Sequence, residues 1–89
     1  RLAITGVIMR ISAAESLIME SLWRQSPQSA EDIVAAVGPE QNWADKTVRT
    51  LINRLLTKGA ISAEREGRRY LYSPAIDRAD YVQTESRGL

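Results

Sequence analysis

The 89-residue sequence contains no cysteine and no histidine. Without them the chain cannot form disulfides, thiolate or imidazole metal sites, or Ser-His and Cys-His catalytic pairs. The sequence also has no glycine-rich loop of the kind that binds phosphate. We therefore predict that the protein is not an enzyme and that it has neither a cofactor nor a metal site.

Long hydrophobic runs are missing as well. The longest apolar stretch, residues 1–11, is far shorter than the about 18 residues of a membrane span, and it lacks a signal-peptide cleavage pattern. We expect one small cytoplasmic domain, because the length leaves no room for two and the lack of cysteine fits a reducing compartment. Met9 is expected to be the natural start, with residues 1–8 upstream of it and residues 1–10 forming an N-terminal extension.

A first helix is predicted from its start signal. Ser12 and Glu15 have the spacing of a capping box, and apolar residues then recur at intervals of three and four. Pro27 disfavours helical backbone at Ser26, so the helix is expected over residues 13–25.

A second, shorter helix is expected to begin after Ser29, whose side chain can cap it. Gly38 and Pro39 form the usual end signal of a helix. Residues 39–43 are therefore expected to form a linker to the next helix.

The third helix, residues 45–58, has the clearest pattern, because its aliphatic residues fall on one face. Either Ala44 or Asp45 occupies the cap position, and Gly59 is a natural end residue. The inward face consists of Val48, Leu51, Ile52, Leu55 and Leu56.

The hydrophobic period then changes from 3.6 to 2, which predicts two strands at residues 61–66 and 69–73 with Gly67 in the turn between them. Three helices followed by a two-stranded hairpin are typical of a winged helix-turn-helix, a mainly α fold, which we place at residues 11–75. From Asp77 the chain is expected to become helical again, with Ala79, Tyr81, Val82 and Glu85 compatible with that pattern.

Four aromatic residues are expected at the core or its edge: Trp23, Trp43, Tyr70 and Tyr72. Stacking of these rings on nucleic-acid bases is a weaker alternative.

The distribution of charge is more informative than the net charge of +1. Residues 12–45 contain one basic and six acidic residues, whereas residues 46–69 contain seven basic and two acidic residues. The positive block falls on the third helix and the hairpin, which are the elements that a winged helix presents to a duplex. Each Lys or Arg placed against a phosphate releases a counterion and strengthens binding at low salt.

The outward face of the third helix carries residue types that read base edges. Arg can form two hydrogen bonds with guanine, Asn can form two with adenine, and a Thr methyl group can pack on the methyl group of thymine. The candidate DNA-binding residues are Lys46, Thr47, Arg49, Thr50, Asn53 and Arg54 on this helix, Arg68 and Arg69 at the hairpin tip, and Ser29, which could contact a phosphate from a helix N-terminus.

Two other interpretations stay open. A polar helix face rich in Lys and Arg is usually only a solvated surface. A winged helix can also act as a protein-interaction module that never contacts DNA, and the acidic first half of the chain keeps this alternative open.

Three segments resemble the penicillinase-repressor family, the BlaI/MecI group of bacterial winged-helix repressors. Residues 11–23 are similar to the first helix of that family, residues 42–61 to its reading helix, and residues 66–74 to its wing. The positions that match the family's groove-facing motif are Lys46, Thr47, Arg49 and Thr50, and Arg68 and Arg69 match its wing.

The resemblance implies a homodimeric transcriptional repressor that binds a palindromic operator in double-stranded DNA. It places the helix at 45–58 in the major groove and the wing at 61–73 on the backbone or in the minor groove, and it implies that residues 76–89 begin C-terminal dimerisation helices. The sequence departs from the family at Ala44, where Ser is usual, and at Asp45, where Pro is frequent. Asp45 brings a negative charge near the predicted DNA-facing side.

Overall fold

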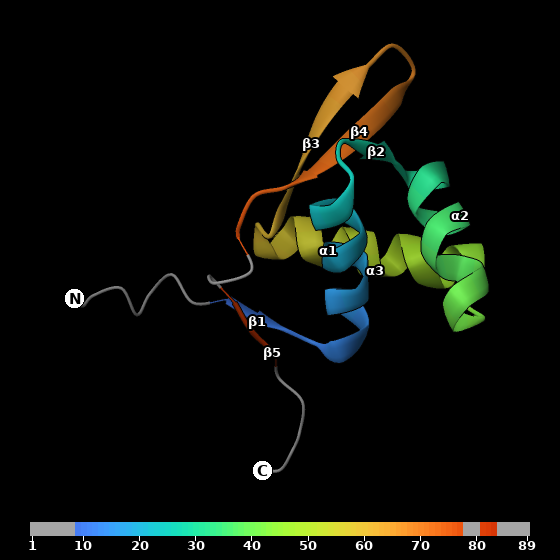
Figure 1. The fold of residues 1–89 in the computed structure, drawn as a ribbon. Coiled ribbons are helices and arrows are strands. Elements are labelled where there is room, and N and C mark those ends of the chain that lie inside the picture. The colour runs from blue at the N-terminus through green and yellow to red at the C-terminus, as the bar shows by residue number, and fades with distance from the viewer. Residues whose placement is uncertain (1–8, 78–80, 84–89) are drawn as a thin grey trace.

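The computed structural model describes residues 9–77 and 81–83 (Figure 1). Within these ranges, three helices are followed by a hairpin that projects beyond them as a wing. No helix in the described ranges has the length and apolar character to span a membrane. The elements of this body are α1 (Ala13–Arg24), α2 (Ala30–Gln41), α3 (Asp45–Lys58), β3 (Ile61–Glu66) and β4 (Arg69–Pro74). The order and type of these elements confirm the predicted winged helix-turn-helix.

Helix α1 begins with the predicted capping box. The backbone N–H of Glu15 donates to Ser12 Oγ at 3.1 Å, and the backbone N–H of Ser12 donates to Glu15 Oε1 at 2.9 Å. These reciprocal bonds satisfy two donors that a helix start leaves without partners. The helix ends at Arg24, one residue before the predicted end.

Helix α2 begins as predicted but ends later. Ser29 caps it, since the backbone N–H of Asp32 donates to Ser29 Oγ at 3.1 Å. The predicted stop at Gly38 and Pro39 and the linker at residues 39–43 are wrong, because the helix continues to Gln41 and ends with Asn42 in the left-handed conformation. A proline clashes with the backbone N–H and with the Cβ of the residue before it. Gly38 has no Cβ, so one of these clashes is absent where the helix continues through this pair.

The core lies between the three helices and the base of the wing. Helix α3 turns Val48, Leu51, Ile52 and Leu55 into it, and Leu56 packs at its edge, as its pattern predicts. The buried apolar residues are Ile11, Ile18, Met19, Leu22, Ile33, Val37, Val48, Leu51, Ile52, Leu55, Ala60 and Ile61. This packing fixes which side of α3 is left to face outward.

Both tryptophans lie at the edge of the core, as expected. Trp23 and Trp43 are partly buried against it, and Trp23 Nε1 donates a hydrogen bond to the carbonyl of Ile76 at 2.9 Å. This bond ties the end of the first helix to the segment that follows the wing.

The wing is an antiparallel pair, with Glu66 opposite Arg69 at its tip and Gly67 at φ +63° in the turn. The sequence predicted two strands, but the sheet has three. Strand β2 (Gln28–Ser29) pairs with β4, so the order is β2-β4-β3. Strand β2 contributes two residues immediately before α2, and it anchors the base of the wing to the helix-turn-helix.

Tyr72 packs against the core as expected, but the prediction that Tyr70 also packs against the helices is wrong. Both residues lie on β4, two positions apart. Tyr72 is paired with Gln28 on one side and Ala63 on the other, where the sheet rests on the helices. Tyr70 is opposite Arg65 nearer the tip, beyond the last pairing with β2, and is 49% exposed. Its ring is therefore part of the wing surface.

A second small sheet lies at the other end of the domain (Figure 1). Strand β1 (Met9–Ile11) pairs in parallel with β5 (Tyr81–Gln83). The expected helix after Asp77 is therefore wrong at residues 81–83, where an aromatic and a β-branched residue favour extended backbone. The remainder of that expectation, and the N-terminal extension before Met9, fall on residues 1–8, 78–80 and 84–89, outside the described residues.

Candidate nucleic-acid interface

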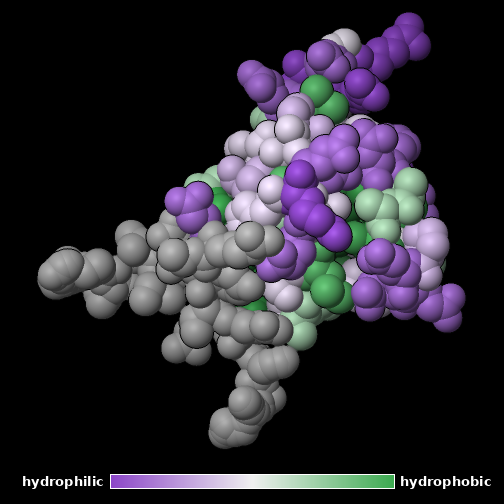
Figure 2. All heavy atoms as spheres, viewed as in Figure 1, coloured by the Kyte–Doolittle hydropathy of each residue, from purple (hydrophilic) through white to green (hydrophobic). Residues whose placement is uncertain are grey.

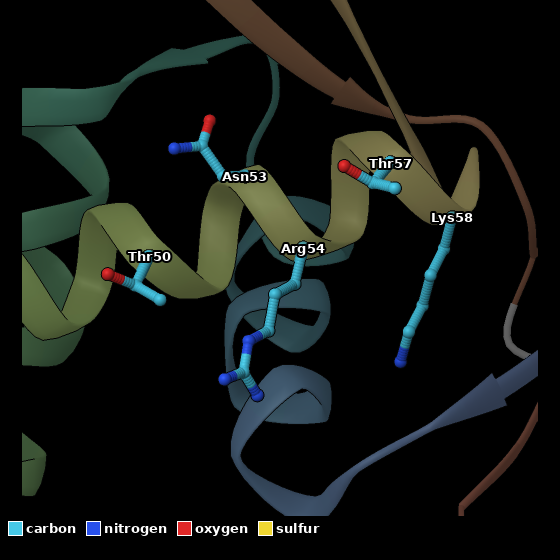
Figure 3. Close-up of a pocket in the computed structure, with 5 residues that line it drawn as sticks. All are labelled: Thr50, Asn53, Arg54, Thr57 and Lys58. Atoms are coloured by element: carbon cyan, nitrogen blue, oxygen red, sulfur yellow. The ribbon is translucent and has the colours of Figure 1, made fainter.

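The outward face of α3 is fully available to a partner. Six predicted site residues on this helix are exposed: Lys46, Thr47, Arg49, Thr50, Asn53 and Arg54. Figure 3 shows the second half of this face, with Asn53 and Arg54 projecting to opposite sides of the helix. The exposed strip is therefore broad, and it presents hydroxyl, amide and guanidinium groups together.

A cleft of about 200 Å³ separates α3 from the wing. Arg49 borders it from α3, Arg68 and Arg69 from the wing, and Tyr70 from the exposed part of β4. The fold thus brings together side chains that are about twenty positions apart in sequence. Figure 2 shows that the projecting wing is covered mainly by hydrophilic residues. Three arginines from the helix and the wing therefore border this cleft, together with Glu31 of α2.

Arg49 is held by two carboxylates. Its Nε donates to Asp45 Oδ1 at 2.5 Å, one helical turn earlier on α3. One of its terminal nitrogens also lies 3.5 Å from Oε2 of Glu31, in the first turn of α2. The hydrogen bond that Arg49 donates to Asp45 is the largest cause that raises the pKa of the Arg49 guanidinium above its usual value. Arg49 stays charged and has a preferred position.

The other cations of this surface have fewer constraints. Arg69 lies 3.4 Å from a carboxylate oxygen of Glu66 across the wing tip, and Arg65 Nε donates to the carbonyl of Gly67 at 3.1 Å. Within the part of the chain that the structure describes, Lys46, Arg54 and Arg68 form no ion pair. These side chains can turn toward an incoming phosphate without breaking a contact.

Lys58 belongs to the positive block of the sequence but pairs with a buried carboxylate of the protein itself. Its ammonium group forms an ion pair with Glu15, whose side chain is 2% exposed. Burial raises the pKa of Glu15, but the hydrogen bond from Lys58 and the bonds from Ser12 outweigh it and lower the pKa below its ordinary value. The pair links the start of α1 to the end of α3.

The structure does not bring Ser29 to this surface. Ser29 is 2% exposed, and its hydroxyl oxygen already accepts the capping bond from Asp32. Its position in β2, paired with Leu71 of β4, explains the burial. Ser29 therefore offers almost no exposed surface to a phosphate.

Two residues of this site, Tyr70 and Glu31, were not predicted from the sequence to belong to it. Tyr70 was assigned to packing, and only the length of the wing beyond β2 exposes it. Glu31 lies in the first turn of α2, and its contact with Arg49 depends on how α2 packs on α3. By contrast, the contact of Asp45 with Arg49 has a sequence signal, since residues four apart on a helix are neighbours. Among the described residues, no cluster of acidic side chains is arranged to bind a metal ion.

A family model and a known protein that match this sequence both point to the same family. The family model described as Penicillinase repressor matches residues 11–89. The penicillinase repressor of Bacillus licheniformis is 34% identical over 79 residues, which are 89% of this chain and 62% of the relative. The chain therefore spans less than two thirds of that relative's length.

Two solved structures are similar as well. The DNA-binding domain of the repressor BlaI superposes with a TM-score of 0.74 at 34% identity, covering 85% of this chain and 93% of that chain. Monomeric BlaI of Bacillus licheniformis in complex with the blaP half-operator gives a TM-score of 0.71 at 33% identity, covering 88% of this chain and 100% of that chain.

The fold is that of a winged helix, and it is similar to the DNA-binding domain of BlaI. The chain belongs to the penicillinase repressor family.

Proposed function

We propose that this chain is the DNA-binding part of a transcriptional repressor and has no enzymatic role. Helix α3 enters the major groove of an operator, and the wing lies on the backbone or in the minor groove. One observation carries the proposal: Arg49 of α3 and Arg68 and Arg69 of the wing border the same exposed cleft. The similar structure of BlaI was solved in complex with a half-operator, which supports DNA binding by this fold.

The side chains divide by chemistry into base readers and phosphate contacts. Arg49 is suited to guanine, Asn53 to adenine, and the methyl groups of Thr47 and Thr50 to thymine. The phosphate contacts are assigned to Lys46, Arg54, Arg68 and Arg69, which fix the position of the protein without reading sequence.

Residues 11–75 form the winged-helix domain, and the region after about residue 76 leads to a homodimer interface. A dimer would place two reading helices about 34 Å apart, matching a palindromic operator. Repression would follow from steric exclusion of RNA polymerase, in the cytoplasm where the DNA is.

The first test is selection of bound sequences from a random duplex pool, followed by two substitutions. Arg49→Ala should cost about 1–3 kcal/mol on the selected sequence and relax the preference at one base pair of each half-site. Lys46→Ala should weaken binding to all sequences alike and lower the slope of log K against log salt by about one. Fluorescence anisotropy at several salt concentrations measures both.

The control is Glu40→Gln, at an exposed position near the end of α2 that is not among the predicted DNA contacts. It should leave affinity and preference unchanged. Unchanged binding after loss of both Arg49 and Lys46 would contradict the role of α3. Equal binding of the wild-type chain to every duplex, or none, would favour a protein-interaction module instead.

A further inference from the structure

Asp45 and Glu31 place negative charge beside the proposed base reader, which at first sight opposes DNA binding. Their geometry suggests another role. Asp45 accepts a hydrogen bond from Arg49 Nε at 2.5 Å, whereas the nearest Glu31 oxygen is 3.5 Å from a terminal nitrogen of Arg49. Asp45 is therefore the closer partner, and it lies on the same helix, so the contact does not depend on movement between elements.

We propose that Asp45 is a positioning residue that holds the Arg49 guanidinium with its terminal edge toward the base pair that it reads. The inference rests on the proposed function and adds a determinant of its specificity. Asp45 acts through Arg49 and makes no base contact of its own.

The hydrogen-bonding capacity of Arg49 makes this arrangement workable. A guanidinium has five N–H donors in a planar fork. Asp45 uses the donor on Nε, and Glu31 lies beside one terminal nitrogen. Each of the two terminal nitrogens carries two N–H groups. At least one donor on each of them is therefore still free at the edge that they form. This edge matches the O6 and N7 acceptors of guanine, so the contact with Asp45 does not compete with base reading.

Positioning has a physical benefit because Arg49 is 44% exposed and has a long side chain. An arginine without a partner must lose rotamer freedom when it binds a base. An exposed ion pair contributes little to the stability of the free protein. It can nevertheless favour the rotamer that binds, and part of the ordering then precedes complex formation.

A carboxylate near DNA also repels phosphates, and the two effects can be separated. Repulsion lowers affinity for every sequence alike, because phosphates occur at every position. Positioning raises affinity only for the duplex with the correct base, so it changes the ratio of affinities for the correct and the wrong base at the position that Arg49 reads. The ratio is therefore the informative measurement, and overall affinity is not.

The experiment uses the duplex selected by the wild-type chain and variants with one base pair changed. Arg49→Ala first identifies the base pair that Arg49 reads. Asp45→Ala should then reduce discrimination at that same base pair by about fivefold to tenfold, within the range of one bidentate contact. Asp45→Asn retains an oxygen acceptor and should restore part of the discrimination. In an Arg49→Ala background, Asp45→Ala should no longer alter the ratio.

The charge control is Glu66→Ala, which removes an exposed wing carboxylate that does not contact Arg49. It should raise affinity for all duplexes and leave every ratio unchanged. Three results would overturn the positioning role: unchanged discrimination in Asp45→Ala, a loss of preference at a different base pair, or an effect that persists without Arg49. If the wild-type chain selects no sequence at all, the proposed function fails first and the positioning role with it.

Discussion

At the scale of single residues, Glu15 performs two tasks that are normally separate. It completes the capping box of α1 and forms the ion pair with Lys58 that reaches the end of α3. Its carboxylate is buried and its pKa is lowered despite that burial. A group whose pKa is lower in the folded than in the unfolded state stabilises the protein at pH values above its unfolded pKa. This stabilisation is lost as the pH falls through the folded pKa.

Glu15→Gln separates these tasks, since Gln at the third helix position can also complete a capping box. We expect the free energy of unfolding to fall by about 1–2 kcal/mol near pH 7, because a charge-assisted hydrogen bond is lost. The difference from wild type should shrink below pH 4.5, the ordinary pKa of this side chain, as the wild-type carboxylate protonates. Urea unfolding across this range measures it.

The control for this prediction is Glu64→Gln on the exposed surface of β3. It should change stability by much less, because an exposed carboxylate contributes little. A Glu15→Gln variant as stable as wild type near neutral pH would show that the ion pair does not stabilise the fold.

At the scale of elements, starts of helices could be predicted better than the end of α2 or the shortest strands. Ser12 and Ser29 signal helix starts through bonds to residues three positions away, and both caps form. Strands β2 and β5 have only two and three residues, and each forms by pairing with a strand that is far away in sequence. Strand β2 has no local pattern that indicates it, and at β5 only the aromatic and β-branched residues favour extended backbone. The end of α2 could not be predicted because Gly38 and Pro39 each signal a helix end when taken alone, whereas together they let the helix continue.

The start of α3 offers a prediction at this scale. Ala44 is its N-cap residue, and its side chain makes no capping bond. Ala44→Ser should stabilise the protein by about 1 kcal/mol, because a serine hydroxyl can accept a bond from a free N–H of the first turn. Thermal or urea unfolding measures the change.

The matched control is Ala36→Ser, at an exposed position inside α2. There the same substitution should be slightly destabilising, since serine has a lower helix propensity than alanine. A loss of stability in Ala44→Ser would indicate that the backbone at Ala44 cannot present a capping side chain.

At the scale of the whole molecule, basic residues from separate parts of the sequence come together on one side of the fold. The basic residues of the third helix and the hairpin could be assigned to the outside from periodicity alone, and the fold then places Arg49 and the two wing-tip arginines around one cleft. Sequence reasoning could not decide how these charges pair. The contact of Glu31 with Arg49, the exposure of Tyr70 and the burial of Ser29 all follow from the docking of α2 and β2 against distant elements.

The central claim is that α3 and the wing together contact duplex DNA. The most direct measurement is an NMR titration of the isotope-labelled chain with the selected duplex, following each backbone amide. We predict that the largest shift changes fall on the first half of α3, around Lys46 to Asn53, and on the wing tip around Gly67. Largest changes on the exposed sides of α1 and α2, with α3 and the wing unaffected, would contradict the account.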